Sequence, residues 1–125
     1  MSFKSILVFD GEQYELTSCV VNVSRKADNR GKPASKSFWS IDIIMDSLED
    51  TTITEWMVNP NLQKDGEIEI YRTDDDVKLK VIQFKKAYCV FMKDSFYTDI
   101  DFMKCFLTIV GEEINIGEAK FTHIS

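Results

Sequence analysis

The 125-residue sequence has few of the side chains that usually carry chemistry: one histidine, His123, two prolines and three cysteines. One imidazole without Cys or carboxylate partners at ligand spacing cannot build a zinc site. A thiol nucleophile would need a base, and this histidine stands near the end of the sequence. Glycine-rich nucleotide-binding motifs and the serine hydrolase elbow are missing too. We therefore expect no enzyme activity, no metal and no cofactor, although an enzyme of unrecognised type remains an alternative.

Long apolar runs are also missing. No stretch approaches the ~18–20 consecutive apolar residues that span a bilayer, so we expect no membrane insertion. Residues 1–13 contain only a short apolar run and no small-residue cleavage site, so we expect no Sec-type signal peptide there. The net charge of −6 argues against binding to phosphate backbones, and hence against nucleic acid as a partner.

The cysteines Cys19, Cys89 and Cys105 are odd in number and have no CxxC spacing. Each lies in an apolar, strand-like run, where a reduced cysteine behaves as a small core residue. A reactive or paired thiol is the alternative. The simpler expectation is folding in a reducing compartment.

What the sequence does contain is apolar and aromatic residues, at 44% and 12%, which is enough for one packed domain over residues 1–125. Alternating patterns predict mostly strands, most clearly over residues 38–47. Asp10-Gly11 fits a tight hairpin turn, and a shift of parity near residues 17–18 indicates a β-bulge. Residues 82–93 read as two strands joined by a bend at residues 85–86.

One short helix is predicted at about residues 51–59. Asp50 or Thr51 could cap it, and Thr52 with Glu55 matches the S/T-x-x-E capping pattern. Pro60 ends it. Three apolar residues at i, i+3 and i+4 would pack this helix on a sheet: Ile53, Trp56 and Met57. The fold class is therefore mainly β, a small β-barrel of two curled antiparallel sheets flanked by one short helix.

Residues 25–37 have no hydrophobic periodicity, five basic residues, a glycine and a proline, which predicts a long exposed loop. Loops of this length are usually functional, and a solvated hairpin connection is the plain alternative. Ile44, Phe106 and Val110 are apolar at strand positions that should face outward. They indicate either subunit contacts or residues buried beneath the helix or a loop.

The order of these features resembles the Hcp-type (TssD) tube proteins of type VI secretion systems in Bacteroidetes, nearly from end to end. The most specific segment is Glu49-Asp50-Thr51 followed by Glu55-Trp56-Met57-Val58-Asn59. The other matching segments are Met1-Ser2-Phe3-Lys4, Asp10-Gly11, Arg25, Gly31-Lys32-Pro33, residues 67–72, residues 74–76, Phe84 and Ala87-Tyr88.

The resemblance implies a β-barrel with one helix that forms hexameric rings. The rings would stack into an inner tube, driven out by a contractile sheath beneath a VgrG-like spike. The partners implied are further copies of the chain, the spike, sheath proteins and, as in some members, an effector carried in the ring. It also implies a protein that is cytoplasmic before firing and is then secreted, or delivered into target cells, without a Sec signal.

In such a tube the loop between the second and third strands contributes to stacking. We therefore expect an inter-ring contact at the following residues: Arg25, Lys26, Asp28, Arg30, Lys32, Pro33 and Lys36. Four of these would meet acidic groups of the next ring: Arg25, Lys26, Arg30 and Lys32. The alternative function is a monomeric β-barrel that binds a small ligand in its mouth.

Overall fold

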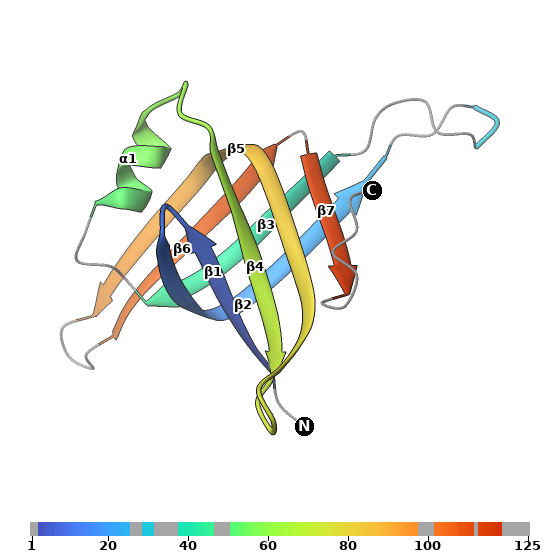
Figure 1. Cartoon of the computed structure of the whole chain (residues 1–125). Helices are drawn as coiled ribbons and strands as arrows, with labels where there is room; N and C mark the ends of the chain where they lie inside the picture. The colour runs from blue at the N-terminus through green and yellow to red at the C-terminus, as the bar shows by residue number, and fades with distance from the viewer. Residues whose placement is uncertain are drawn as a thin grey trace.

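A computed structural model describes residues 3–25, 29–31, 38–46, 51–97, 102–111 and 113–118. Seven strands and one helix follow one another along this part of the chain (Figure 1). Their bounds are β1 Phe3–Phe9, β2 Glu12–Ser24, β3 Phe38–Asp46, α1 Thr52–Val58, β4 Lys64–Arg72, β5 Val77–Tyr97, β6 Phe102–Gly111 and β7 Glu113–Glu118.

All seven strands belong to one antiparallel sheet in the order β4-β1-β2-β3-β6-β5-β7, which closes on itself through a further pairing of β4 with β5. The prediction of a mainly-β barrel with one short helix is confirmed. Closure pairs the edges that an open sheet would expose. Only β7, added to the outer side of β5, lies beyond the closed ring of strands.

Two turn and bulge predictions are also confirmed. The β1–β2 hairpin turns at Asp10 and Gly11, with φ angles of 52° and 76°. Positive φ at both central residues is the geometry that matches the twist of hairpin strands. The register of β2 against β3 shifts between Leu16 and Ser18, as expected for a bulge.

The expected bend lies at Lys86, whose φ is 53°, but it does not end a strand. β5 runs on through it for 21 residues, from Val77 to Tyr97. The Asp65 carboxylate accepts a hydrogen bond of 2.9 Å from the backbone N–H of Lys86, which holds the bent peptide. One strand therefore takes the place of the separate strands predicted there. Its first part pairs with β4 and β7, and its last part pairs with β6.

Helix α1 begins at Thr52 and ends at Val58, with Thr51 as N-cap and Asn59 as C-cap. The predicted capping is wrong in detail, because Thr51 makes no side-chain bond to the backbone of the first turn. Its hydroxyl instead donates to the Glu55 carboxylate at 3.2 Å, so a side-chain pair replaces the reciprocal capping box. Asp50 lies outside the described residues.

The helix covers one end of the barrel (Figure 1). Ile53 and Trp56 are buried, and Met57 is partly buried against the core. The Trp56 indole N–H donates to the Ala87 carbonyl at 3.1 Å. Its ring packs 5.5 Å from that of Phe9 and 6.4 Å from that of Phe84. The aromatic side chains thus join the helix to strands from both sides of the barrel.

Candidate assembly surface

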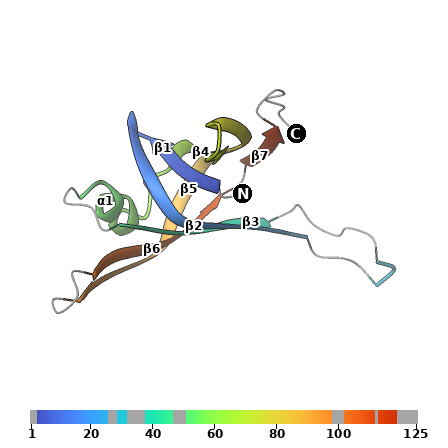
Figure 2. The ribbon, with the colours of Figure 1, turned by 90° about the horizontal axis from the view of Figure 1, so that it is seen from below.

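Parts of four strands form a layer that is one wall of the closed barrel and continues past it at both ends. We call it the four-stranded layer, and it consists of residues 17–24 of β2, all of β3 and β6, and residues 88–97 of β5. The pairing of β2 with β1 stops at Leu16, and that of β5 with β4 stops at Ala87. Past these points, no strand of the described chain pairs with the outer edges of β2 and β5. Figure 2 shows the layer nearly flat, with α1, β1 and β4 on one side.

The two faces of the layer differ in what packs against them. The core face carries the buried side chains of alternate residues, such as Ile41 and Ile43 of β3 and Leu107 of β6. The opposite face, here called the outer face, carries the residues between them. Ile44 and Phe106 lie opposite each other on this outer face and are half-buried. Because α1 packs on the core face, the helix does not cover them.

Polar residues share the outer face with these apolar ones. The Thr108 hydroxyl donates to the Asp42 carboxylate at 2.7 Å, and the Asn22 amide donates to the same carboxylate at 3.4 Å. Lys93 lies 5.9 Å from the centre of the Phe106 ring. At the end of the outer face nearest the long loop is an apolar hollow of about 510 Å³. Its lining includes Val110, Phe38 and Ser40.

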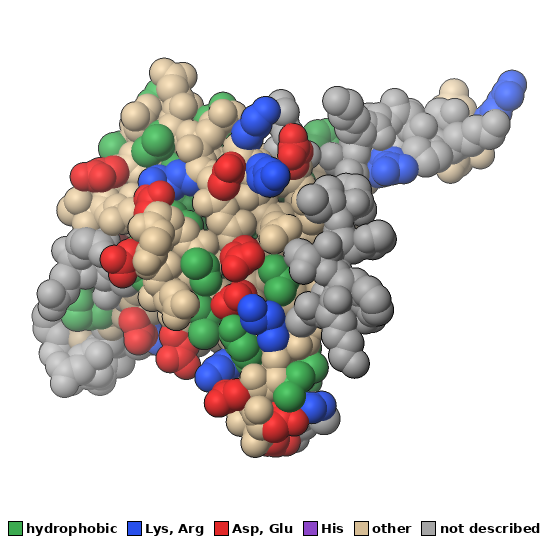
Figure 3. Space-filling view, viewed as in Figure 1, with side chains coloured by type: hydrophobic (Ala, Val, Ile, Leu, Met, Phe, Trp, Pro, Cys, Tyr) green, Lys and Arg blue, Asp and Glu red, His purple; other side chains and the backbone are tan. Residues whose placement is uncertain are grey.

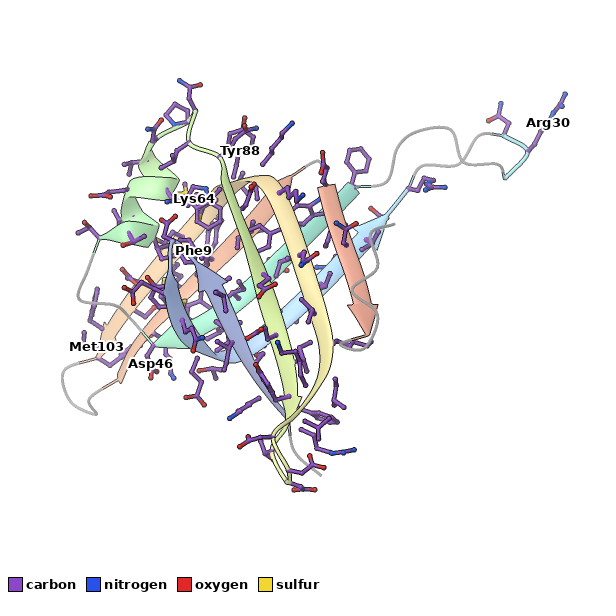
Figure 4. The ribbon with its side chains drawn as sticks, viewed as in Figure 1. Phe9, Arg30, Asp46, Lys64, Tyr88 and Met103 are labelled. Atoms are coloured by element: carbon purple, nitrogen blue, oxygen red, sulfur yellow. The ribbon has the colours of Figure 1, made fainter. Side chains whose placement is uncertain are left out.

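The described parts of the two ends of the layer differ in their exposed charged residues. At one end β2 passes into the predicted long loop, where Arg25 and Arg30 are exposed. Figure 4 places Arg30 far from the barrel, with Asp46 and Met103 at the other end of the layer. The Asp46 side chain is 83% exposed while it pairs with Lys104 at 2.6 Å, and Asp94 is also exposed. The remaining predicted stacking residues, Lys26, Asp28, Lys32, Pro33 and Lys36, lie outside the described part.

Sequence reasoning missed two residues at the Asp46 end. Phe96 of β5 and Met103 of β6 lie opposite each other and are 58% and 50% exposed. The alternation of β6 places Met103 on the same face as Cys105 and Leu107, which indicates a core residue. Alternation reports the face of a residue but not whether anything covers that face, so no sequence signal marks this exposure.

The barrel body presents a different, evenly charged surface, with acidic and basic side chains interspersed (Figure 3). Several form ion pairs, including Lys78 with Glu69 at 2.7 Å and Arg72 with Asp75 at 2.7 Å. The Arg72 guanidinium hydrogen bonds to Asp75 and lowers the pKa of that carboxyl. Among the described residues on the face drawn in Figure 3, paired charges of both signs form no continuous basic patch.

The three cysteines are all free thiols. Burial, with a smaller contribution from nearby Asp42, raises the pKa of Cys19 to about 11, and burial raises that of Cys89 to about 11 as well. Burial, with the carboxylate of Asp94 close by, raises the pKa of Cys105 to about 12. Thiols that stay protonated at neutral pH are poor nucleophiles. The geometry therefore favours the core interpretation of these residues; His123 lies outside the described part.

Within the described ranges, no three His, Cys, Asp or Glu side chains gather in a group that could hold a metal ion. Nor does the described chain contain a helix with the length and apolar character needed to cross a membrane.

Comparison with known proteins places this fold in a family. The family model described as hemolysin coregulated protein Hcp (TssD) matches residues 1–124. A search of the curated proteins found no match. Among solved structures, Hcp1 from Flavobacterium johnsoniae has a TM-score of 0.78 and 25% sequence identity, covering 92% of this chain and 97% of its own.

More distant structures share the fold alone. Hcp1 from Salmonella typhimurium has a TM-score of 0.71 at 10% identity, with 96% of this chain and 97% of that one covered. A chain of the sheath/tube terminator of an extracellular contractile injection system has a TM-score of 0.69 at 15% identity, with coverage of 91% and 93%. The same overall fold therefore recurs in proteins with little sequence in common with this chain.

Proposed function

The chain belongs to the Hcp (TssD) family of type VI secretion tube proteins, which are structural and not enzymes, and on this premise we propose that it forms hexameric rings that stack into the inner tube. The observation that carries the proposal is the pair of open strand edges on the four-stranded layer. An unpaired edge exposes a row of N–H and C=O groups that can pair with another chain.

The directions of the strands suit such pairing. Consecutive neighbours in the layer are antiparallel, so β2 at one edge and β5 at the other run in opposite directions. The open edge of β5 in one copy can therefore continue the antiparallel ladder with β2 of the next. The open segments, residues 17–24 and 88–97, are offset along the strands. A closed cylinder of strands requires such a stagger.

Closure into a ring also assigns the two faces of the layer. The barrel bodies and α1 helices lie on the core face, and six bodies would not fit inside a ring whose wall is one sheet thick. The outer face, with Ile44, Phe106 and Val110, therefore lines the lumen, and the bodies with their paired charges face outward. Sheath proteins would meet the bodies, and an effector would meet the lumen.

Stacking is supported by the charges at the two ends of the layer. Arg25 and Arg30 lie at one end, and Asp46 and Asp94 lie at the other. Rings that stack in the same orientation bring these opposite charges together. We propose that the loop residues Arg25, Lys26, Asp28, Arg30, Lys32, Pro33 and Lys36 make this contact. A spike protein of the VgrG type would cap the last ring. We propose that the protein is cytoplasmic until expulsion and is then secreted or delivered into a target cell.

The alternative of a monomeric ligand-binding barrel is less well supported. The barrel interior is filled by large side chains that are almost fully buried, among them Trp56, Phe84 and Ile41. The mouth on the α1 side is closed by the helix itself. The apolar hollow of about 510 Å³ lies on the outer face of the layer and not in the barrel.

Particle mass tests the ring. In light scattering we expect a particle of six times the 14.5 kDa chain mass, visible as a ring in negative-stain images.

Proline substitutions in β2 test whether its open edge makes the contact between subunits. The N–H groups of Val20 and Val23 point to opposite edges of the strand, so proline at each position removes a hydrogen bond from a different edge. One proline removes a bond to β3 and destabilises the domain. The other removes a bond at the open edge, and we expect a folded single chain.

Urea unfolding identifies which proline variant retains the β3 ladder, since proline is tolerated where a strand N–H faces solvent. If light scattering of that stable variant still gives the mass of six chains, the proposal that subunits pair through the β2 edge is wrong. If the unmodified protein has the mass of one chain at every concentration, the ring itself is wrong.

Deleting residues 28–35 tests the loop separately. We expect rings of unchanged mass and an unchanged unfolding midpoint, since the deletion spares every strand, but no stacking into tubes in negative-stain images. A deletion variant that unfolds would contradict a role for this loop in assembly alone.

A further inference from the structure

Phe96 and Met103 form a small apolar surface at the end of the layer farthest from the long loop. They lie directly opposite each other on β5 and β6, so their side chains point to the same face. That face is the core face, because Cys105, two residues from Met103, is buried. Here, however, the layer has passed beyond the barrel, and the two side chains are 58% and 50% exposed. We call this pair the apolar shelf.

An acidic residue borders the shelf. Asp94 is two residues before Phe96 on the same strand and lies opposite Cys105, so it shares the core face. It is exposed as well. Single exposed apolar residues are ordinary on protein surfaces. Two large ones side by side, next to a carboxylate, are more typical of a contact surface.

The end of the layer nearest the long loop carries the complementary residues, Val23 and Arg25. Val23 of β2 lies opposite Trp39, whose side chain is in the core, so Val23 also points to the core face. It is 53% exposed, and Arg25 follows two residues later, just beyond the end of β2. One end of the core face thus presents an apolar residue followed by a cation. The opposite end presents an anion followed by two apolar residues.

We propose that the apolar shelf of Phe96 and Met103 receives Val23 of a second copy of this chain in the next ring, with Asp94 beside Arg25 of that copy. This rests on the proposed stacking of rings and adds an apolar anchor to its charged loop contact. Both patches lie on the core face at opposite ends of the layer. Translating one copy along the layer therefore places its Val23 end next to the apolar shelf of the neighbouring copy. Such a head-to-tail contact is heterologous and repeats without limit, as a tube requires.

The test uses rings of the full-length chain. In the double variant Phe96→Ser and Met103→Ser, we expect rings of wild-type mass, because the proposed edge pairing uses the backbone N–H and C=O groups of β5, which serine retains, and not these two side chains on the core face. The ring concentration needed for tubes, followed by sedimentation and negative-stain images, should rise at least tenfold. Phe3→Ser is the matched control: Phe3 is an equally exposed aromatic, at 59%, on β1 of the barrel body. It should leave tube formation unchanged.

Charge reversal tests the neighbouring pair. Arg25→Glu alone and Asp94→Lys alone should each weaken stacking, and the two together should restore part of it. If the Phe96/Met103 variant forms tubes as readily as the wild type, the proposal is wrong. This holds also if the variant forms tubes normally but no longer binds a spike protein. Wild-type rings that never stack overturn both the anchor and the stacking. A wild-type mass of one chain instead refutes the ring, so the failures are distinguishable.

Discussion

Replacing Trp56 with alanine is expected to lower the free energy of unfolding by about 3–5 kcal/mol, the usual loss for a large buried aromatic residue. Trp56 is 1% exposed and packs against the rings of Phe9 and Phe84. The substitution removes these contacts and leaves a cavity where the only described helix meets the barrel. Urea unfolding followed by circular dichroism measures the change. Because a domain of this size is stable by about 5–15 kcal/mol, much of its stability is at stake.

Two further variants separate the parts of this effect. Trp56→Phe retains much of the packing but leaves the Ala87 carbonyl without the 3.1 Å indole bond, so we expect a loss of about 1–3 kcal/mol. Val58→Ala, on the same helix but 71% exposed, should change stability by less than about 0.5 kcal/mol. A similar loss at Val58 and at Trp56 would show that helix propensity, and not packing on the barrel, determines the stability of α1.

Placing an alanine at Gly66 of β4 is expected to destabilise the domain by about 1–3 kcal/mol through overpacking. A Cβ atom there would lie 2.7 Å from the Phe84 ring, 2.9 Å from the Val8 carbonyl oxygen and 3.0 Å from the Cβ of Phe9. The Val8 oxygen is backbone in the paired strand β1, so it cannot move aside without disturbing the ladder. The loss of chain entropy in the unfolded state favours alanine by only about 0.4–1 kcal/mol, which is too little to compensate.

Thermal and urea unfolding of Gly66→Ala measure this effect, with Gln13→Ala as control. Gln13 is an exposed residue of β2, so its replacement should leave the unfolding midpoint nearly unchanged. A stabilised Gly66→Ala variant would mean that β1 and β4 approach each other less closely than the 2.9 Å contact implies.

These stability variants also test the division of the molecule into a body and a layer. Trp56 and Gly66 lie in the barrel body, away from both open edges of the layer. Partial destabilisation at either site should therefore leave the ring intact as long as the domain remains folded. The proline variant at the open edge of β2 should do the reverse, leaving the domain stable and abolishing the ring.

The sequence by itself determined those features that depend on neighbouring residues. The spacing of Ile53, Trp56 and Met57 before Pro60 places the helix within one residue of each end, since helical periodicity and proline sterics act locally. Asp10-Gly11 specifies its turn for the same reason, because the backbone of glycine tolerates positive φ. The order and spacing of the segments carried the resemblance to the family.

Only the tertiary structure decided which strands pair and where that pairing stops. The buried positions of β5 change parity at the bend, from Ile82 and Phe84 to Ala87 and Cys89. Such a change indicates a bend but not the partners of each half, so the sequence could not reveal that one strand passes from β4 and β7 to β6. The open edges of the layer exist because β1 and β4 stop short of it. The exposure of Phe96 and Met103 follows from the same fact. Strand alternation has a period of two and assigns each side chain to a face; cover on that face comes from residues far away in the chain.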